Sequence, residues 1–177
     1  IRSLTLEKKS LETHLRLLQA QVEPHFLFNT LSNILSLLDT DPIRGKSMLM
    51  NLTQYLRSSL SRTRDRITTL GQEMDLVQAY LKIHRVRMGE RLTYTIDVPD
   101  RIRDRAFPPM LVQPLVENAL IHGLEPQVTG GDILVRGEDH ARYYRLTVSD
   151  TGPGLPEETV WGVGLTNVAE RLEALFH

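Results

Sequence analysis

The 177-residue sequence contains no cysteine. Disulfides, thiolate zinc sites and cysteine nucleophiles are therefore excluded, and the composition fits a reducing compartment. No apolar stretch approaches the roughly 20 residues that a membrane-spanning helix needs, and no signal peptide is visible. The formal net charge is only −1. Nucleic-acid binding through a basic face, suggested only by the arginines within residues 62–66, is therefore disfavoured.

The start of the chain has the pattern of amphipathic helices. Leucines recur every seven residues from position 4 to position 18, and no glycine or proline interrupts residues 1–23, which predicts a helix with a short coiled-coil pattern. Pro24 removes a backbone donor, so a kink is expected just before His25. The next apolar stripe has helical spacing and predicts a buried face made of Leu27, Leu31, Ile34 and Leu38.

A second helix is expected after a short turn. Asp41 is the predicted cap, and Pro42 occupies the first helical position. The predicted apolar face of this helix consists of Leu49, Leu52, Leu56 and Leu60. Two such helices form an antiparallel hairpin whose apolar face is only half covered. Pairing with a second copy into a four-helix bundle is therefore expected, which predicts a homodimer.

The pattern changes to mixed helix and strand after residue 66. Helices are predicted near residues 70–88 and 110–122 and from about residue 165, and strands at residues 92–98, 133–135 and 144–148. Helices followed by mixed elements indicate an α+β protein with two domains, residues 1–66 and 67–177. Because the sequence starts and stops within helical patterns, we expect it to be a piece of a longer protein.

The first of three polar clusters spans residues 113–123. Asn118 and His122 are four positions apart, so both are expected to project from one helical face. An asparagine oxygen can help to hold Mg²⁺, whose other ligands are usually waters and substrate phosphates. Taken alone, the cluster is explained equally well as polar residues at a helix end.

The second cluster, residues 150–154, directly follows a predicted strand. The Asp150 carboxylate can accept a hydrogen bond from an exocyclic amine, and Gly152 and Gly154 allow the backbone to approach a flat ring closely. An ordinary turn after a strand explains this cluster better if it is taken alone.

The third cluster, residues 162–167, opens a helix. Gly162 and Gly164 would present backbone N–H groups and the positive end of the helix dipole to a phosphate, with Asn167 as a weaker candidate ligand. Each cluster could serve a different part of a nucleotide: metal, base and phosphates. Their order and spacing therefore favour a nucleotide site more strongly than any single cluster does.

The three clusters resemble the N, G1 and G2 boxes of the ATPase superfamily that unites gyrase, histidine kinases and MutL. Residues 18–31 resemble the phosphoacceptor box of the LytS-like sensor histidine kinases, and residues 109–119 resemble that family's N box. The resemblance implies a helical hairpin followed by an α/β two-layer sandwich ATP-binding domain of the Bergerat type. The family's last strands, expected after residue 177, would be missing, so the domain would be truncated at its C-terminus.

The resemblance also implies a function. The protein would use ATP to phosphorylate His25 and pass the phosphoryl group to an aspartate of a response-regulator receiver domain. Asn118 would hold Mg²⁺ and Asp150 would select adenine. The remaining ATP ligands would be His122, Gly152, Gly154, Gly162, Gly164 and Asn167. The chain would be the cytoplasmic portion of a bacterial inner-membrane protein, attached through a sensor region outside this sequence.

The residues around His25 agree with this function. A predicted polar stripe opposite the apolar face should expose the imidazole, and it consists of His25, Asn29, Ser32 and Ser36. A neutral imidazole is a competent nucleophile near pH 7. Phe26 follows where many histidine kinases carry an acidic residue, which leaves Glu23 as the candidate base or orienting group. Alternatively, Glu23 is a solvated surface residue and the ring proton passes to water or to a group on the ATP-binding domain.

Two other functions compete with this hypothesis. Superfamily members that hydrolyse ATP tend to carry a carboxylate base one turn before the asparagine, where this chain has Pro114. A plain ATPase is therefore disfavoured. A dimeric scaffold that binds nucleotide and signals by conformation alone is the serious alternative. The short segment between the G1 and G2 boxes, residues 155–161, is expected to form a reduced ATP lid.

Overall fold

The computed structural model describes residues 24–61, 67–154 and 163–176. In chain order they form α2 (Pro24–Thr40), α3 (Pro42–Ser61), β1 (Thr68–Thr69), α4 (Leu70–Met88), β2 (Leu92–Asp97), α5 (Asp100–Arg103), β3 (Ala106–Phe107), α6 (Gln113–Asn118), β4 (Gly131–Asp139), β5 (Tyr144–Asp150) and α7 (Val163–Phe176). The predicted α+β class is confirmed. The helix predicted for residues 1–23 lies outside the described residues.

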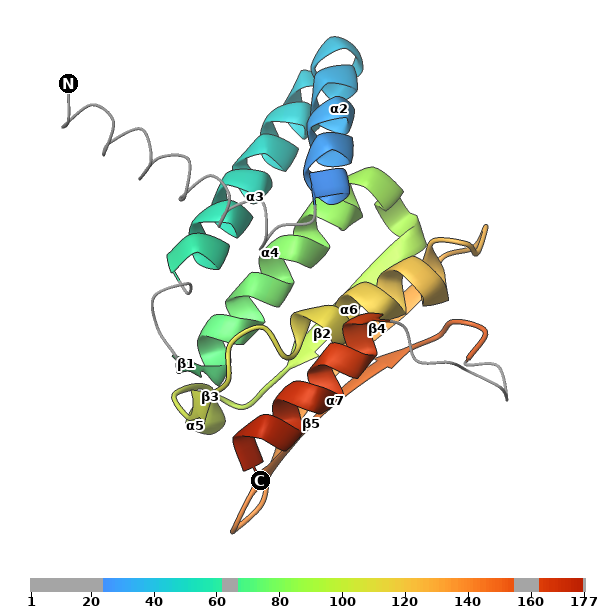
Figure 1. Ribbon diagram of the computed structural model, residues 1–177. Helices are drawn as coiled ribbons and strands as arrows, with labels where there is room; N and C mark the ends of the chain where they lie inside the picture. Colours follow the sequence, from blue (N-terminus) through green and yellow to red (C-terminus); the bar gives the residue numbers. More distant parts are fainter. Residues whose placement is uncertain (1–23, 62–66, 155–162, 177) are drawn as a thin grey trace, which may run out of the picture.

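Helices α2 and α3 lie side by side and are called the helix pair below (Figure 1). Asp41 separates them, and its carboxylate accepts a hydrogen bond from the backbone N–H of Arg44 at 3.1 Å, which confirms the predicted cap. Gly45 allows the two helices to approach closely, because a Cβ atom at position 45 would lie 3.0 Å from the backbone nitrogen of Leu38.

The buried face of α2 differs from the predicted one. Ile34 is buried and Leu27 is partly buried, but Leu31 and Leu38 remain 39% and 41% exposed. Thr30 is buried instead. The difference arises because α2 contacts α4 as well as α3, and the periodicity of α2 alone cannot reveal that second neighbour.

The inner face of α3 is also rotated from its predicted position. Leu52 is buried and Leu56 partly buried, whereas Leu49 is 44% exposed. Met48 and Tyr55 complete the buried face, at 1% and 2% exposure. This face packs on α4, so the helix pair and the rest of the described chain share one hydrophobic core.

Helix α4 is the central element of the fold. It begins at a capping box, in which the Thr69 side chain accepts from the Gln72 backbone N–H and the Gln72 side chain accepts from the Thr69 backbone N–H, both at 3.2 Å. α4 lies between the helix pair and the sheet (Figure 1). Because it has neighbours on several sides, residues around most of its circumference are buried, including Leu76 and Leu81 at 0% exposure.

The main sheet has the strand order β2-β4-β5, with β2 and β4 parallel and β4 and β5 antiparallel. The strands include the three predicted segments. Along β4, Ile133 and Val135 are buried while Asp132 and Arg136 are exposed, as expected for a sheet that is covered on one face. Helices α6 and α7 lie in front of this sheet in Figure 1. In the part of the chain that is described, no helix has the length and apolarity needed to cross a membrane.

Candidate active site

Asn118 lies at a change in helix type. It ends α6, and residues Ala119–Leu124 continue as a π-helical turn, in which the Glu125 N–H bonds to the Leu120 carbonyl at 2.9 Å. The α-helix predicted to run on past Asn118 is therefore replaced at this point by a π-turn, which has a wider repeat. Asn118 is partly buried and His122 is exposed. Such turns occur frequently at functional sites.

The first and second polar clusters meet at Asp150. A Cβ atom at position 123 would lie 2.6 Å from Oδ1 of Asp150, and one at position 152 would lie 2.5 Å from the same oxygen. Gly123 and Gly152 thus leave room for the carboxylate between them. Asp150 Oδ1 accepts a hydrogen bond from the Gly152 N–H at 2.8 Å, which holds the turn after β5 against the end of the π-helical turn.

The start of β4 fixes the same turn from the other side. The backbone N–H of Asp132 donates to Oγ1 of Thr151 at 2.9 Å, and the Thr151 N–H donates to the Asp132 carbonyl at 3.2 Å. Gly154 follows with a φ of +80° and no neighbour that a Cβ atom would meet within 4 Å. A positive φ favours glycine at this position, so the local backbone accounts for the glycine without a ligand.

The third cluster is only partly described. Gly162 lies outside the described residues, whereas Gly164 belongs to the first turn of α7 and Asn167 is exposed one turn further on. Helix α7 packs on α6. The proposed phosphate-binding glycine Gly164 is therefore carried by an element that contacts the helix ending at Asn118.

A Mg²⁺ ion would need ligands from the nucleotide here. Within residues 24–61, 67–154 and 163–176, no group of three or more His, Cys, Asp or Glu side chains could hold a metal ion. Mg²⁺ usually binds one or two protein oxygens and completes its shell with phosphates and water. The Asn118 amide therefore fits a magnesium ion that arrives with a nucleotide.

Gln113 connects this region to the helix pair. Its side-chain nitrogen donates to the Tyr55 hydroxyl and to Oε1 of Glu117, each at 2.6 Å. Tyr55 belongs to α3, and Gln113 begins α6. The role of Glu117, which the sequence leaves undecided, thus includes accepting a hydrogen bond from Gln113 beside Asn118.

Glu73 is a buried carboxylate that supports the same helix. It is 0% exposed, and its oxygens accept hydrogen bonds from the backbone N–H groups of Met110, at 2.8 Å, and Val112, at 3.4 Å. Met110 has a φ of +57°, which is uncommon for a residue other than glycine. Glu73 therefore holds the strained turn that leads into α6, because charge-assisted bonds to the backbone offset the cost of burying its carboxylate.

His25 lies in the first turn of α2 and is exposed, as predicted. The rest of the predicted polar stripe is exposed too: Asn29, Ser32 and Ser36. The side-chain nitrogen of Asn29 lies 3.3 Å from Nδ1 and 3.1 Å from Nε2 of His25. A neutral amide donates hydrogen bonds but is not a base at neutral pH, so Asn29 can orient the ring. Glu23 lies outside the described residues.

His25 borders a cavity of about 220 Å³ between the helix pair and α4. Other lining residues on α2 include Asn29 and Asn33, and the facing wall includes His84, Arg87 and Glu125. Asn118, His122 and Asp150 do not line it. His25 and the nucleotide candidates are therefore in separate places in this conformation.

Aromatic side chains hold the start of α2 against α4. The Phe26 ring centroid lies 5.5 Å from that of Tyr55, 5.3 Å from that of Tyr80 and 5.5 Å from that of His84. Aromatic pairs in this distance range are stabilising beyond their burial. Phe26, which the sequence marks only as a missing acid, thus anchors the backbone next to His25.

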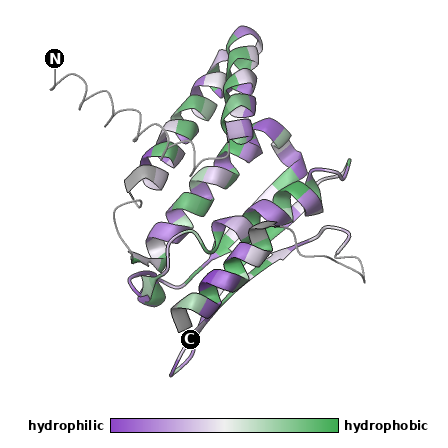
Figure 2. Ribbon diagram, viewed as in Figure 1, coloured by the Kyte–Doolittle hydropathy of each residue, from purple (hydrophilic) through white to green (hydrophobic). Residues whose placement is uncertain are grey.

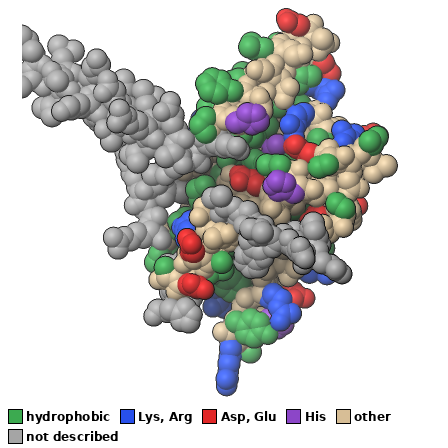
Figure 3. Space-filling view, turned by 45° about the vertical axis from the view of Figure 1, so that its right-hand side comes forward, with side chains coloured by type: hydrophobic (Ala, Val, Ile, Leu, Met, Phe, Trp, Pro, Cys, Tyr) green, Lys and Arg blue, Asp and Glu red, His purple; other side chains and the backbone are tan. Residues whose placement is uncertain are grey.

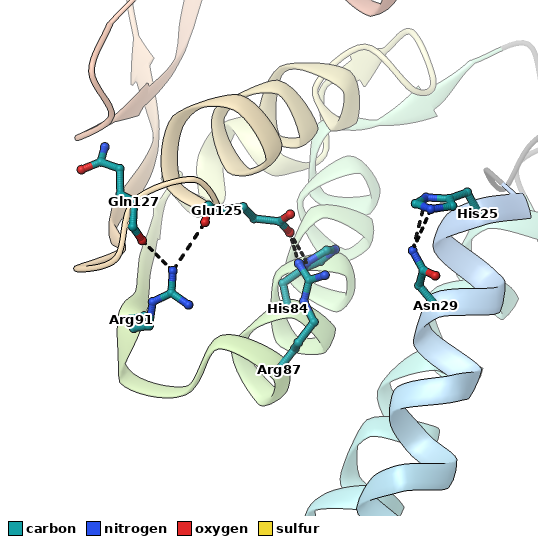
Figure 4. Close-up of polar contacts among 7 residues, drawn as sticks. All are labelled: His25, Asn29, His84, Arg87, Arg91, Glu125 and Gln127. Carbon is teal, nitrogen blue, oxygen red and sulfur yellow. Dashed lines mark hydrogen bonds and ion pairs between the residues drawn. The ribbon is translucent and has the colours of Figure 1, made fainter.

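His84 is a buried histidine that stays neutral. Burial and the nearby Arg87 charge lower its pKa from 6.5 to about 3. The Arg87 guanidinium lies 3.0 Å from Nδ1 of His84 (Figure 4). Since arginine can only donate, Nδ1 accepts and Nε2 carries the proton.

Glu125 completes the polar group on the α4 side of the cavity. Its carboxylate forms an ion pair with Arg87 and also lies 3.4 Å from Nδ1 of His84 (Figure 4). The contact with His84 is not a salt bridge, because that ring is uncharged. Glu125 follows the π-helical turn directly, so this ion pair links α4 to the end of the first polar cluster.

Sequence reasoning missed four residues of this arrangement: Tyr55, Glu73, His84 and Arg87. All four lie at positions that become buried or paired only through contacts far apart in the chain. The one local signal was the position of Glu73 and His84 on the helix predicted for residues 70–88, since charged or titratable residues inside an otherwise buried helix need partners.

Comparisons with known proteins agree with the resemblance seen in the sequence. A family model described as "Histidine kinase" matches residues 13–92. The chain is 36% identical over 171 residues to the sensor histidine kinase YesM of Bacillus subtilis, covering 93% of this chain and 30% of that protein. It is 33% identical over 165 residues to the sensor histidine kinase/phosphatase LytS of Staphylococcus aureus, covering 93% of this chain and 28% of that protein.

A solved structure shares the fold. The histidine kinase domain of the blue-light activated histidine kinase EL346 from Erythrobacter litoralis superposes with a TM-score of 0.52 at 18% identity. The match covers 94% of this chain and 85% of that one. At this identity the likeness concerns the fold alone. The sensor proteins YesM and LytS are much longer than this chain, which spans about 30% of their length.

Proposed function

The chain is a relative of the LytS-like sensor histidine kinases, and from that premise we propose that it phosphorylates itself on His25 with ATP. The phosphoryl group then passes to an aspartate of a response-regulator receiver domain. The observation that carries this proposal is the exposed His25 imidazole, with the Asn29 amide within hydrogen-bond distance of both ring nitrogens.

In the proposed reaction, an imidazole nitrogen of His25 forms a bond to the γ-phosphorus while the bond from that phosphorus to the β,γ-bridging oxygen breaks. ADP leaves, and the ring proton passes to a base. Asn29 orients the ring so that one nitrogen lone pair is presented to the nucleotide. Glu23 is the candidate base, with water as the alternative acceptor. ATP supplies the phosphoryl group, and Mg²⁺ neutralises the charge on its phosphates.

The nucleotide is assigned to the region between α6 and the turn after β5. Asp150 Oδ1 is occupied by the Gly152 N–H, and its other oxygen is assigned to the adenine amine. Gly123 and Gly152 leave room for this carboxylate between them. Asn118 supplies an oxygen to Mg²⁺. Gly164 at the start of α7, together with Gly162, is assigned to the phosphates.

Phosphoryl transfer needs a rearrangement or a second copy. The described residues that are assigned to the nucleotide do not line the cavity that His25 borders. Either the helix pair moves relative to α6, or His25 of one copy reaches the nucleotide of another. We assign the dimer contact to an apolar face of the helix pair, whose large exposed residues are Phe28, Leu31, Leu35, Leu38, Ile43, Leu49 and Met50.

The exposure of this face supports a second copy as its occupant. Phe28, Leu35, Ile43 and Met50 are 64–84% exposed. Hydrophobic residues recur along both helices of the pair in the hydropathy colouring of the ribbon (Figure 2), and hydrophobic side chains appear on the surface of the molecule (Figure 3). Large apolar side chains exposed together on one pair of helices are typical of an interaction site. In the proposed whole protein the chain is cytoplasmic and joined to the membrane through a region outside this sequence.

Incubation with ATP labelled at the γ-phosphate tests the proposal. The kinase leaves an acid-labile, base-stable label on the chain, whereas a scaffold that signals by conformation alone leaves none.

Asn118→Ala should retain nucleotide binding but lose labelling, because Asn118 is assigned to Mg²⁺. Asp150→Asn should weaken ATP binding about ten- to a hundredfold, the usual worth of a charge-assisted hydrogen bond. Unchanged affinity in both variants would refute the assignment of the nucleotide region.

A further inference from the structure

The cavity beside His25 presents hydrogen-bond donors that the proposed nucleotide site does not use. Arg87 and His84 line it from α4, and Asn29 and Asn33 line it from α2. Figure 4 shows the His25 side chain on the side of α2 that faces the end of α4 carrying His84 and Arg87. Among the described residues that line it, Glu125 is the only acidic one. Such a set of donors suits an anion.

His84 supplies a second, independent sign of a ligand. The residue is only 5% exposed, and its Nε2 has no hydrogen-bond partner among the described residues. Because Nδ1 accepts from Arg87, Nε2 is a buried N–H donor. A buried donor without an acceptor costs free energy. His84 lines the cavity while its Nε2 is covered by neighbouring atoms, so a turn of the ring is needed to bring this donor to an anion in the cavity.

Arg87 is positioned to bind the same anion. It is paired with Glu125, and both side chains remain about one-third exposed, at 34% and 29%. The pair is therefore not sealed in the core, and the guanidinium has five N–H donors in a planar fork that matches a phosphoryl group. If a phosphoryl group replaces the Glu125 carboxylate, the Arg87 guanidinium still has an anionic partner.

From these contacts we infer that the cavity is the binding site for the phosphoryl group of phosphorylated His25. Arg87 exchanges the Glu125 carboxylate for the phosphoryl oxygens, and the Nε2–H of His84 donates to the same group. The inference rests on the proposed phosphorylation of His25. It adds a binding site for phosphorylated His25 that is separate from the site assigned to ATP. This site lies on the α4 side of the cavity, where Phe26 contacts His84.

Chemical loading allows a test without ATP. Phosphoramidate transfers its phosphoryl group to a histidine nitrogen: its own P–N bond breaks, a new P–N bond to the imidazole forms, and ammonia leaves with the ring proton. The ³¹P resonance of phosphorylated His25 is then followed as a function of pH. A nearby cation lowers the pKa of the phosphoryl group, and removal of that cation raises it.

Three variants separate a binding site from a structural ion pair. Arg87→Gln should raise the phosphoryl pKa by about one unit, since an opposite charge at close range shifts a pKa by one to three units. Glu125→Gln should lower it, because the competing carboxylate is gone. Arg103→Gln is the matched control, because Arg103 is also paired with a carboxylate, that of Asp75, and is 32% exposed; it should leave the phosphoryl pKa unchanged.

The inference predicts pKa shifts of opposite sign for the phosphoryl group in Arg87→Gln and Glu125→Gln. A structural pair would make Arg87→Gln and Glu125→Gln act alike or not at all on the phosphoryl group, and this would overturn the inference. Glu125→Gln alone keeps the test valid if Arg87→Gln fails to fold. If the parent chain takes up no phosphoryl group at His25, the cavity does not accommodate the phosphorylated ring and the inference is overturned, whereas the proposed function is tested separately by labelling with ATP. If His25 is loaded and its phosphoryl pKa is the same in all variants, the inference is overturned and the proposed function is unaffected.

A free anion is distinguished by adding inorganic phosphate to the unphosphorylated chain. The side-chain N–H signal of His84 reports occupation of the cavity. We expect it to stay unchanged at millimolar phosphate and to shift only after His25 is loaded. The same shift with free phosphate would make the cavity a general anion site and would contradict its assignment to phosphorylated His25.

Discussion

The hydroxyl of Tyr55 accepts a hydrogen bond from the side-chain nitrogen of Gln113 at 2.6 Å. This contact joins α3 to the first turn of α6, the helix that ends at Asn118. The two residues are 58 positions apart in the chain. The helix pair is therefore connected by a buried polar contact to the element that carries the proposed magnesium ligand, and any movement of one relative to the other must break it.

Tyr55→Phe removes the acceptor and retains the ring that packs on Phe26 and Tyr80. We expect a loss of about 1–3 kcal/mol in the free energy of unfolding, because the substitution leaves a buried donor of Gln113 without this partner. Urea denaturation measures the loss. Tyr144→Phe is the control, since its hydroxyl makes a longer bond of 3.3 Å at an exposed site, and it should cost much less. Equal losses in the two variants would contradict the importance of the Tyr55–Gln113 contact.

His84 should make the fold sensitive to acid. Its pKa is about 3 in the folded protein, below the ordinary 6.5, because of burial and the Arg87 charge. The unfolded chain therefore takes up a proton that the folded protein excludes. The stability that results is complete above pH 6.5 and is lost as the pH falls toward 3.

The corresponding variant is His84→Gln. Between about pH 7.5 and about pH 5 the parent should lose about 2 kcal/mol of stability through this histidine alone, and the variant should lack that loss. Unfolding in urea across this pH range provides the measurement. His140→Gln, at an exposed histidine, should keep the parent's pH dependence. A variant at position 84 with the parent's full acid loss would show that His84 is not the group responsible.

The sequence predicted elements better than contacts. The helix expected at residues 70–88 and the strands at residues 92–98 and 144–148 are present, because their hydrophobic periodicity is local. The buried faces of α2 and α3 were misplaced, since the contact with α4 rotates both faces and comes from a distant part of the chain. The π-helical turn after Asn118 has no signal in the periodicity of a short segment.

Some features of the candidate site could likewise be predicted from the sequence, and others depend on tertiary packing. The approach of Asp150 to Gly123 follows from motifs whose spacing is visible in the sequence. The neutral state of His84 depends on Arg87 and on burial by Phe26 and Tyr80. Such a pKa shift arises from tertiary packing and could not be predicted from residue types.

The exposed apolar face of the helix pair predicts a dimer. Replacement of Phe28 and Leu35, which are 70% and 66% exposed, by serine should convert the dimer to a monomer without unfolding it, since neither side chain contributes to the described core. Sedimentation of the full chain at tens of micromolar measures the association. Val128→Ser removes an apolar side chain that is 88% exposed elsewhere and should leave the dimer intact. A parent chain that is already monomeric at this concentration would contradict the proposed dimer.

Identification of the phosphorylated residue tests the central claim most directly. After incubation with labelled ATP, mass spectrometry under neutral conditions should locate the phosphoryl group on His25. His25→Gln should abolish labelling while nucleotide affinity stays unchanged, because none of the described residues assigned to the nucleotide lines the cavity that His25 borders. Label on His14 or His84, or full labelling of His25→Gln, would contradict the assignment of His25 as the phosphoacceptor.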